Sequence, residues 1–448
     1  MAHPHDRNRP DHADAAPPPA APAAPAAPAA PAADVHAALA NFLRATALND
    51  AAKQPPAPKE HKFWSTQPVP QTLPARETQH IRHHGEPIET KPLHAVPTRP
   101  YSLIDHFEWS DIALTDDKQL EETYKLLNEN YVEDVAAMFR FDYSRHFLRW
   151  ALLPPGYQPS WHVGVRVKSN RKLVAFISAI PATVSIHSNP ISMVEINFLC
   201  VHKKLRSKRL APVLIREITR RVNLRNIWQA VYTAGALLPS PVSVSNYYHR
   251  ALNPKKLIEV GFSRLQPRMT IARTVKLFAL KSQTETPTIR PMTLDDTLEA
   301  CALVKQHMRQ YDLHVDMTLE DLRHWLLPRE GVIYTYVVHD PHSNAITDLV
   351  SFYSLPSSVI NHPTHNSLNA AYAFCIVPNK TPINTLMKDA LVLARNNNFD
   401  VFNVLDLAHN AQFFSDLKFT AGDGSLNYYL YNWKCRPIPK EKNALILL

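Results

Sequence analysis

Two residue types with special chemistry are scarce in this sequence. Only eight of the 448 residues are glycine, and the four cysteines, Cys200, Cys301, Cys375 and Cys435, show no C-x-x-C spacing. So little glycine excludes a collagen-like chain, which needs it at every third position. Without paired cysteine spacing, neither a disulfide framework nor a cysteine-based zinc site is indicated. We therefore expect a reducing, cytoplasmic setting.

Long apolar runs are also missing. The longest, such as residues 173–186, are interrupted by Pro181 and are shorter than the ~20 residues that a membrane helix needs. The N-terminus has proline at every third position where a signal peptide would need an unbroken apolar core. We expect no transmembrane segment and no secretion.

Proline, in contrast, is abundant at one end of the chain. Nineteen of the 39 prolines fall within the first 100 residues, and residues 17–33 are only proline and alanine. Such a segment samples polyproline II and cannot build a packed core. We expect a disordered arm at 1–55, inert rather than a tether, followed by an N-terminal half at 56–285 and a C-terminal half at 286–448.

The rest of the chain alternates between helical and strand-like patterns. Leu214, Ile218 and Val222 recur every four residues, which predicts the buried stripe of a helix. The element order predicts an α/β (α+β) fold with two similar halves in tandem around a mixed sheet. The expected helices are 120–130, 211–223, 294–308 and 383–396; the expected strands are 138–143, 173–180, 194–201, 331–339, 347–355 and 425–433.

Most of the net positive charge lies in one segment. The formal charge is +9, and residues 203–225 hold nine basic side chains and one acid, Glu217. They follow an apolar strand and open a helix, whose N-terminal N–H groups favour a bound phosphate. Arg206, Lys208 and Arg209 would add full charges. This context favours a phosphate-containing ligand, with a solvated helix face as the alternative.

Nucleic acid is the rival interpretation of this basic segment. It would need basic residues spread over a face, with aromatic side chains for stacking. Because the segment is compact and follows an apolar strand, we expect a nucleotide-containing cofactor and no nucleic acid.

Several motifs resemble those of a known family. EINFLCVHK at 195–203 resembles the first signature of the N-myristoyltransferases, and KFTAGDG at 418–424 resembles the second, with Thr420 where the family has glycine. The resemblance covers residues 59–448 with the motifs in the family's order. Further matches are HKFWSTQPVP (61–70), YVED (131–134), MFRFDY (138–143), YTAG (232–235), NHPTH (361–365) and NYYLYNW (427–433).

The resemblance implies two acetyltransferase-like (GNAT-type) halves. It also implies transfer of a myristoyl (C14) group from myristoyl-CoA, a co-substrate rather than a permanently bound cofactor, to the amine of an N-terminal glycine. The basic loop stands where ordinary acetyltransferases place a glycine-rich pyrophosphate loop. The implied acyl-CoA contacts are Lys62, Phe63, Trp64, Phe198, Leu199, Cys200, Val201, Arg206, Ser207, Lys208, Arg209, Leu210 and Ala211.

The resemblance also assigns the catalytic roles. The backbone N–H groups of Phe198 and Leu199, at a strand bulge, would stabilise the charge that develops on the thioester oxygen. The C-terminal carboxylate of Leu448 would take the proton of the amine, with Asn197 and Thr233 holding the amine in line. The apolar last residues suit burial in such a site, although they would also suit plain packing on the core.

The implied peptide groove is rich in aromatic residues, for which core packing is the default role. Its residues are Tyr131, Val132, Asp134, Phe139, Phe141, Tyr143, Gly235, Tyr247, His249, Ser357, Tyr372, Asp423 and Gly424. Relatives often continue Glu-Asp with further acids, whereas Val135 and Ala136 follow here, so a weaker preference for a basic residue near substrate position 7 is expected. The implied partners are peptides with an N-terminal glycine from nascent or processed proteins, and the ribosome is a further candidate. The enzyme itself is expected to be a monomer.

Two other functions stay open at this point. A general acetyl-CoA-dependent N-acetyltransferase would leave the Phe63–Trp64 segment without purpose, and a non-catalytic acyl-CoA-binding scaffold is hinted at only by Thr420. Cys200 could suggest a covalent acyl intermediate, although a small buried strand residue is favoured. The 23 histidines include no H-E-x-x-H motif, so no metal site is expected.

Overall fold

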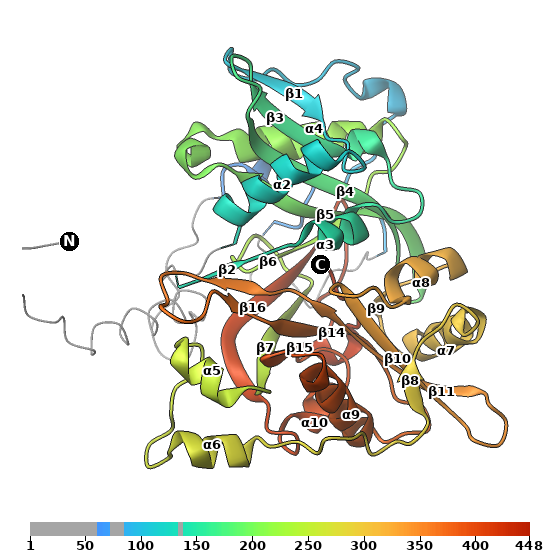
Figure 1. Cartoon of the computed structure of the whole chain (residues 1–448). Helices are drawn as coiled ribbons and strands as arrows, with labels where there is room; N and C mark the ends of the chain where they lie inside the picture. The colour runs from blue at the N-terminus through green and yellow to red at the C-terminus, as the bar shows by residue number, and fades with distance from the viewer. Residues whose placement is uncertain (1–60, 72–84, 133–137) are drawn as a thin grey trace, which may run out of the picture.

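One long mixed sheet organises the molecule. In this computed structural model, residues 61–71, 85–132 and 138–448 are described. The sheet has 13 strands in the order β1-β3-β4-β5-β6-β16-β7-β15-β14-β11-β10-β8, with β9 paired to β4 outside this path (Figure 1). The pairs β5–β6 and β14–β15 are parallel. The predicted fold class, α/β with a mixed sheet, is confirmed.

The N-terminal part of the sheet is covered by helices on both faces. Its strands are β1 (Phe107–Asp111), β3 (His162–Val167), β4 (Leu173–Ile186), β5 (Asn189–Val201) and β6 (Ala230–Ala234), and its helices are α2 (Asp117–Asn130), α3 (Arg145–Leu152) and α4 (Leu210–Asn223). Side chains alternate along β4, so Phe176 packs with α2 and α3 whereas Ile177 packs with α4. This explains why the strand is an almost continuous apolar run.

The C-terminal part repeats the mixed pattern. Its helices are α5 (Pro254–Glu259), α6 (Ile271–Leu277), α7 (Thr297–Met308), α8 (Leu319–Leu326), α9 (Ile383–Asn396) and α10 (Ala411–Phe414). Its strands are β7 (Ser243–Ala251), β8 (Ile289–Pro291), β9 (Leu313–Val315), β10 (Ile333–His339), β11 (Ile346–Ser354), β14 (Ala370–Val377), β15 (Val401–Leu405) and β16 (Thr420–Tyr431). A separate small sheet joins β13 (Ser367–Leu368), β12 (Ser357–Val359) and β2 (Phe139–Phe141).

Polar side chains satisfy the free N–H groups at helix starts. Asp116 caps α2 by accepting the Gln119 N–H at 2.9 Å. At α8, Thr318 and Asp321 form a reciprocal capping box. The stripe predicted for α4 is confirmed, since Leu214, Ile218 and Val222 are all buried.

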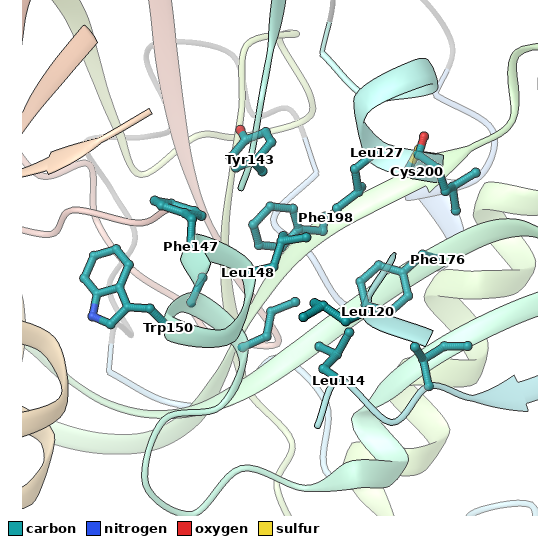
Figure 2. Close-up of a cluster of buried hydrophobic side chains, with 14 of the residues drawn as sticks. Leu114, Leu120, Leu127, Tyr143, Phe147, Leu148, Trp150, Phe176, Phe198 and Cys200 are labelled. Atoms are coloured by element: carbon teal, nitrogen blue, oxygen red, sulfur yellow. The ribbon is translucent and has the colours of Figure 1, made fainter. Parts of the chain in front are cut away.

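The two halves interlock rather than lie side by side. Strand β16, from the end of the chain, lies between β6 and β7 and pairs with both. A reciprocal pair of hydrogen bonds joins α3 to α8: the Trp150 indole donates to the His324 carbonyl at 3.1 Å, and the His324 ring contacts the Trp150 carbonyl at 2.7 Å. Trp150, Phe147 and Phe198 belong to one buried cluster (Figure 2). Ile333 and Tyr353 of the C-terminal half belong to the same cluster.

Several element boundaries differ from the sequence predictions. The helix at 383–396 has the predicted bounds, whereas the strand expected at 138–143 is only Phe139–Phe141 because its partner β12 is itself three residues long. The last strand starts five residues earlier than expected, at Thr420. Helices α3, α5, α6, α8 and α10 were not predicted, and the division into halves at residue 285 stays a prediction.

The remaining predictions about the chain's organisation concern its N-terminus and membranes. The arm predicted at 1–55 lies outside the described residues. Among the residues that are described, none of the helices is both long and apolar enough to span a bilayer.

Candidate active site

A bulge in β5 forms the centre of the site. Ser178 of β4 pairs with Asn197, and Phe176 pairs with Cys200. One residue of β4, the one between Phe176 and Ser178, therefore faces two residues of β5, Phe198 and Leu199, which leave the regular ladder. Phe198 has φ of +53°, a conformation that is strained for a bulky side chain. Its ring is 1% exposed, and this burial holds the backbone in place.

Asn197 connects the bulge to the last residue of the chain. Its side-chain oxygen accepts the N–H of Phe198 at 2.8 Å, and its amide nitrogen donates to the backbone oxygen of Leu448. The last segment is itself anchored, because the Ala444 N–H donates to the Leu313 carbonyl at 2.8 Å. Leu445 is fully buried. The structure therefore brings Asn197, Phe198 and Leu448 together.

An apolar cavity opens beside this cluster. It measures about 880 Å³ including its open mouth and lies between β5, β6 and α4. Asn197, Phe198, Leu199 and Thr233 all line it. Its further walls include Trp64, Tyr131, Ile177, Val194, Ile196, Ile215, Ile218 and Val222. The cavity can hold a long apolar chain with its reactive end at the bulge.

The segment with Lys62, Phe63 and Trp64 closes one wall of this cavity. Trp64 lies in the short helix Trp64–Thr66 and stacks on Tyr232 with ring centroids 5.6 Å apart. Phe63 contacts Trp64 edge-on at 5.3 Å. The sequence analysis placed Trp64 among the acyl-CoA contacts, whereas Tyr232 appeared there only as the first residue of the YTAG motif.

The basic segment serves two purposes, which corrects its interpretation as one phosphate site. Arg220 is buried and, with Arg221, holds Glu217 at 2.6 and 2.8 Å. Arg206 donates to the carbonyl of Asn130 at the end of α2, 2.6 Å away. These three charges therefore stabilise the fold, because a buried acid and a helix end need them.

The rest of the loop still suits an anion. Lys204, Ser207, Lys208 and Arg209 are exposed next to the start of α4, whereas Leu210 is buried and Ala211 is half-buried. Arg209 adopts a left-handed conformation and its side chain does not cap the helix. The first N–H groups of α4 thus lack that side-chain cap and face the exposed cations.

Cys200 is a structural residue rather than a nucleophile. Burial raises the pKa of its thiol to about 12, so the thiolate is not available at neutral pH. Its sulfur contacts the Leu126 carbonyl in α2, within the buried cluster (Figure 2). Burial and this contact place the Cys200 side chain in the core, and Val201 beside it is half-buried.

The predicted groove residues form a chain of aromatic contacts. Tyr131 contacts Tyr143 and Phe198, Phe141 contacts Tyr372, and Tyr372 contacts Tyr247, all within 6.4 Å between ring centroids. Phe139 continues this chain through Phe262 to His249, and Ser357 pairs with Phe141 in the small sheet. Gly235 lies beside Ser425, and Val132 is exposed. Asp134 lies outside the described residues.

Glycines allow β16 to approach His249 closely. The register of β16 against β7 shifts between Ala421 and Ser425, so Gly422, Asp423 and Gly424 leave the ladder. A Cβ at Gly422 would come within 2.1 Å of the His249 ring. Burial lowers the pKa of His249, against the opposing effects of Asn403 and Asp423. His249 is therefore a neutral hydrogen-bonding group in the groove wall.

The substitution at Thr420 does not disturb this motif. Thr420 is exposed, pairs with His249 and has no positive φ, so the backbone does not require glycine there. Its hydroxyl donates to the His249 carbonyl at 3.3 Å, so the one sequence feature that favoured a non-catalytic scaffold fits the strand pairing.

Glu195 is a functional candidate that the sequence analysis did not single out. It is 9% exposed, and the Asn197 amide lies 3.5 Å from its carboxylate. The signal was an acid in an otherwise apolar strand. Within the described ranges, no group of three His, Cys, Asp or Glu side chains could hold a metal ion.

Comparisons with known proteins show the family of the chain. The family "Myristoyl-CoA:protein N-myristoyltransferase" matches by its N-terminal domain at residues 87–245 and by its C-terminal domain at 259–445. Glycylpeptide N-tetradecanoyltransferase 2 of Danio rerio is 54% identical, and the match covers 87% of this chain and 77% of the relative. Glycylpeptide N-tetradecanoyltransferase 1 of Arabidopsis thaliana is 49% identical, and the match covers 87% of this chain and 90% of the relative. The Saccharomyces cerevisiae N-myristoyltransferase crystallised with myristoyl-CoA superposes with a TM-score of 0.83 at 41% identity, over 87% of this chain and all of that one. The chain therefore belongs to the N-myristoyltransferase family.

Proposed function

We propose that this acyltransferase moves the tetradecanoyl group of myristoyl-CoA to the amine of an N-terminal glycine at the β5 bulge. The observation that carries the proposal is the contact set of Asn197. Its amide joins the Phe198 N–H to the end of the chain at Leu448, on the wall of an apolar cavity. An oxyanion donor and a carboxylate are thereby placed within reach of one reacting centre.

The bulge supplies the electrostatic part of catalysis. Attack by an amine places negative charge on the thioester oxygen, and the backbone N–H groups of Phe198 and Leu199 receive it. The Phe198 N–H is held by Asn197 in the free protein. It turns to the oxyanion when the thioester enters.

The terminal carboxylate of Leu448 takes the proton of the amine. A free α-amine has a pKa of about 8, so only ~1 kcal/mol is needed to deprotonate it at neutral pH. A weak base suffices when it is partly desolvated and correctly placed. Asn197 fixes the carboxylate, and Thr233, on the same cavity wall, orients the amine.

Acyl-CoA binds with its chain in the cavity and its phosphates at the basic loop. Lys204, Lys208 and Arg209, with the Ser207 hydroxyl, hold the phosphates at the start of α4. Lys62, Phe63 and Trp64 cover the pantetheine portion. The exposure of the loop and the position of Trp64 on the cavity wall support this placement.

The enzyme acts as a monomer in the cytoplasm on nascent or processed proteins, near the ribosome. The four cysteines are free and buried, in keeping with a reducing compartment.

The direct test is incubation of the full chain with labelled acyl-CoAs of several lengths and peptides that begin with glycine or alanine. We expect transfer of the C14 group to the glycine peptide alone. Binding of acyl-CoA without transfer would leave the scaffold function, and a preference for acetyl-CoA would leave the general acetyltransferase.

Acyl length should affect affinity strongly. Each methylene buried in the cavity is worth ~0.8 kcal/mol, so a C12 chain loses about 1.6 kcal/mol, or about fifteen-fold in Kd. Calorimetric titration with C14 and C12 acyl-CoA measures this, with CoA alone as the control for the phosphate contacts. Equal affinities would mean that the chain does not lie in the cavity.

The preference for a basic residue in the substrate should be weak. In this sequence the acids Glu133 and Asp134 are followed by the apolar Val135 and Ala136. Fewer acids than in an acid-rich relative therefore attract a Lys or Arg near substrate position 7. Replacing that Lys by Ala in a peptide should raise KM less than in an acid-rich relative. An equal rise in both enzymes would contradict this expectation.

A further inference from the structure

A second hollow lies behind the end of the chain. It encloses about 1020 Å³ including its open mouth, and both halves of the molecule form its walls. Leu448 and Glu195 line it from one side, and Asp316, Asp321 and Trp325 line it from the other. Asn197 and Phe198 line the acyl cavity instead. Leu448 and Glu195 therefore stand between the reacting centre and this hollow.

Glu195 and the end of the chain share one amide group. The Asn197 nitrogen donates to the Leu448 oxygen and lies 3.5 Å from the Glu195 carboxylate. The backbone of Leu448 also lies close enough to that carboxylate to lower its pKa. The two carboxylates are thus linked through Asn197 in a buried site, where interacting acids titrate as a pair.

Among the described residues that line the hollow, none carries a basic side chain. Of the described residues that line the hollow, the titratable ones are Glu195, Asp316, Asp321 and Cys375, with the Leu448 terminus. Burial raises the pKa of Glu195 to about 7, against the opposing effects of the Leu448 backbone and Asn197. Burial also keeps the Cys375 thiol neutral, since its pKa rises to about 12. Near neutral pH, Glu195 can therefore both accept and release a proton.

The reaction needs an exit for one proton. As the C–N bond forms and the C–S bond breaks, the glycine ammonium loses two protons. One protonates the departing CoA thiolate and the other must leave the site. Bound acyl-CoA fills one side of the bulge and the peptide fills the groove.

We propose that Glu195 is a relay residue that receives this proton from the Leu448 carboxylate and releases it to solvent in the hollow. The inference rests on the proposed role of Leu448. Glu195 does not touch the substrate, so it acts through the terminal carboxylate. It gives the site an outlet separate from both substrate channels.

The test is the pH profile of kcat for Glu195→Gln. The amide keeps the size of the side chain and can still accept a hydrogen bond, but it cannot carry the proton. We expect kcat to fall by at least about tenfold and the decline of the wild-type kcat below about pH 7 to disappear. The Kd for acyl-CoA should not change. Glu195→Asp should restore part of the pH dependence.

Ser192→Ala is the matched control, because Ser192 lines the same hollow without a titratable group. It should leave kcat and its pH profile unchanged. A Glu195→Gln enzyme with wild-type kcat would overturn the relay. A Glu195→Gln enzyme with a low kcat that still declines at acid pH like the wild type would also overturn the relay, because Glu195 would then only shape the site. Unchanged acyl-CoA affinity shows that the variant is folded, and failure of the Leu448 role is detected separately by a C-terminal extension.

Discussion

Adding two or three residues after Leu448 should abolish turnover while acyl-CoA binding is kept. The extension replaces the terminal carboxylate by a neutral peptide group next to Asn197. General-base contributions are typically 10²- to 10⁴-fold, so we expect kcat to fall by about 100-fold or more. The hollow behind Leu448 can receive the extra residues, so the chain should still fold.

Leu448→Ala provides the control for this prediction, because it keeps the carboxylate and removes only part of the apolar side chain. It should change kcat by less than about tenfold, since only packing is lost. Single-turnover kinetics with C14 acyl-CoA and a glycine peptide, together with the Kd for acyl-CoA, separate chemistry from binding. Full activity in the extended enzyme would refute the role of the carboxylate.

Replacing Glu217 by Gln should produce the largest loss of stability. The Glu217 side chain is fully buried and holds Arg220 and Arg221, and it accepts the Tyr101 N–H at 3.2 Å. The substitution leaves Arg220 buried without its partner, which typically costs about 3–5 kcal/mol. Urea denaturation measures the change in the free energy of unfolding.

The effect of Glu217 should depend on pH. Burial tends to raise its pKa, but the hydrogen bonds from Arg220 and Arg221 outweigh this and lower it. A lowered folded-state pKa means that the contribution is present above the unfolded-state pKa and is lost as the pH falls through the folded one. The wild type should therefore lose more stability in acid than the variant does.

Glu121→Gln is the matched control, because Glu121 forms an ion pair with Arg145 at the surface, where the arginine side chain is 58% exposed. Exposed pairs contribute about 0–1 kcal/mol, so its unfolding curve should nearly coincide with the wild type. A loss for Glu217→Gln no larger than this would mean that the α4 ion pairs do not stabilise the fold.

Local patterns in the sequence predicted the fold class and several helices and strands, and they gave the order of the site motifs along the chain. The four-residue spacing of Leu214, Ile218 and Val222 is a property of one helix and could be recognised directly. The signature around Asn197 placed the bulge residues correctly. The same sequence could not show that Arg220 and Arg221 serve Glu217, because a basic run looks alike whether it faces solvent or a buried acid.

Contacts between distant parts of the chain were out of reach. Nothing near residue 420 indicates that β16 inserts between β6 and β7, since register is chosen among many apolar strands of similar pattern. Trp64 on Tyr232 and Trp150 on His324 join segments more than 160 residues apart. The hollow behind Leu448 exists only because such segments meet.

The insertion of β16 has a consequence for how the protein is made. Strands β6 and β7 are both synthesised long before β16, yet they are joined in the sheet only through it. Until residue 431 has left the ribosome, both strands keep an open edge, which is prone to pair with other chains. Chains released early should therefore aggregate rather than fold into a partly active enzyme.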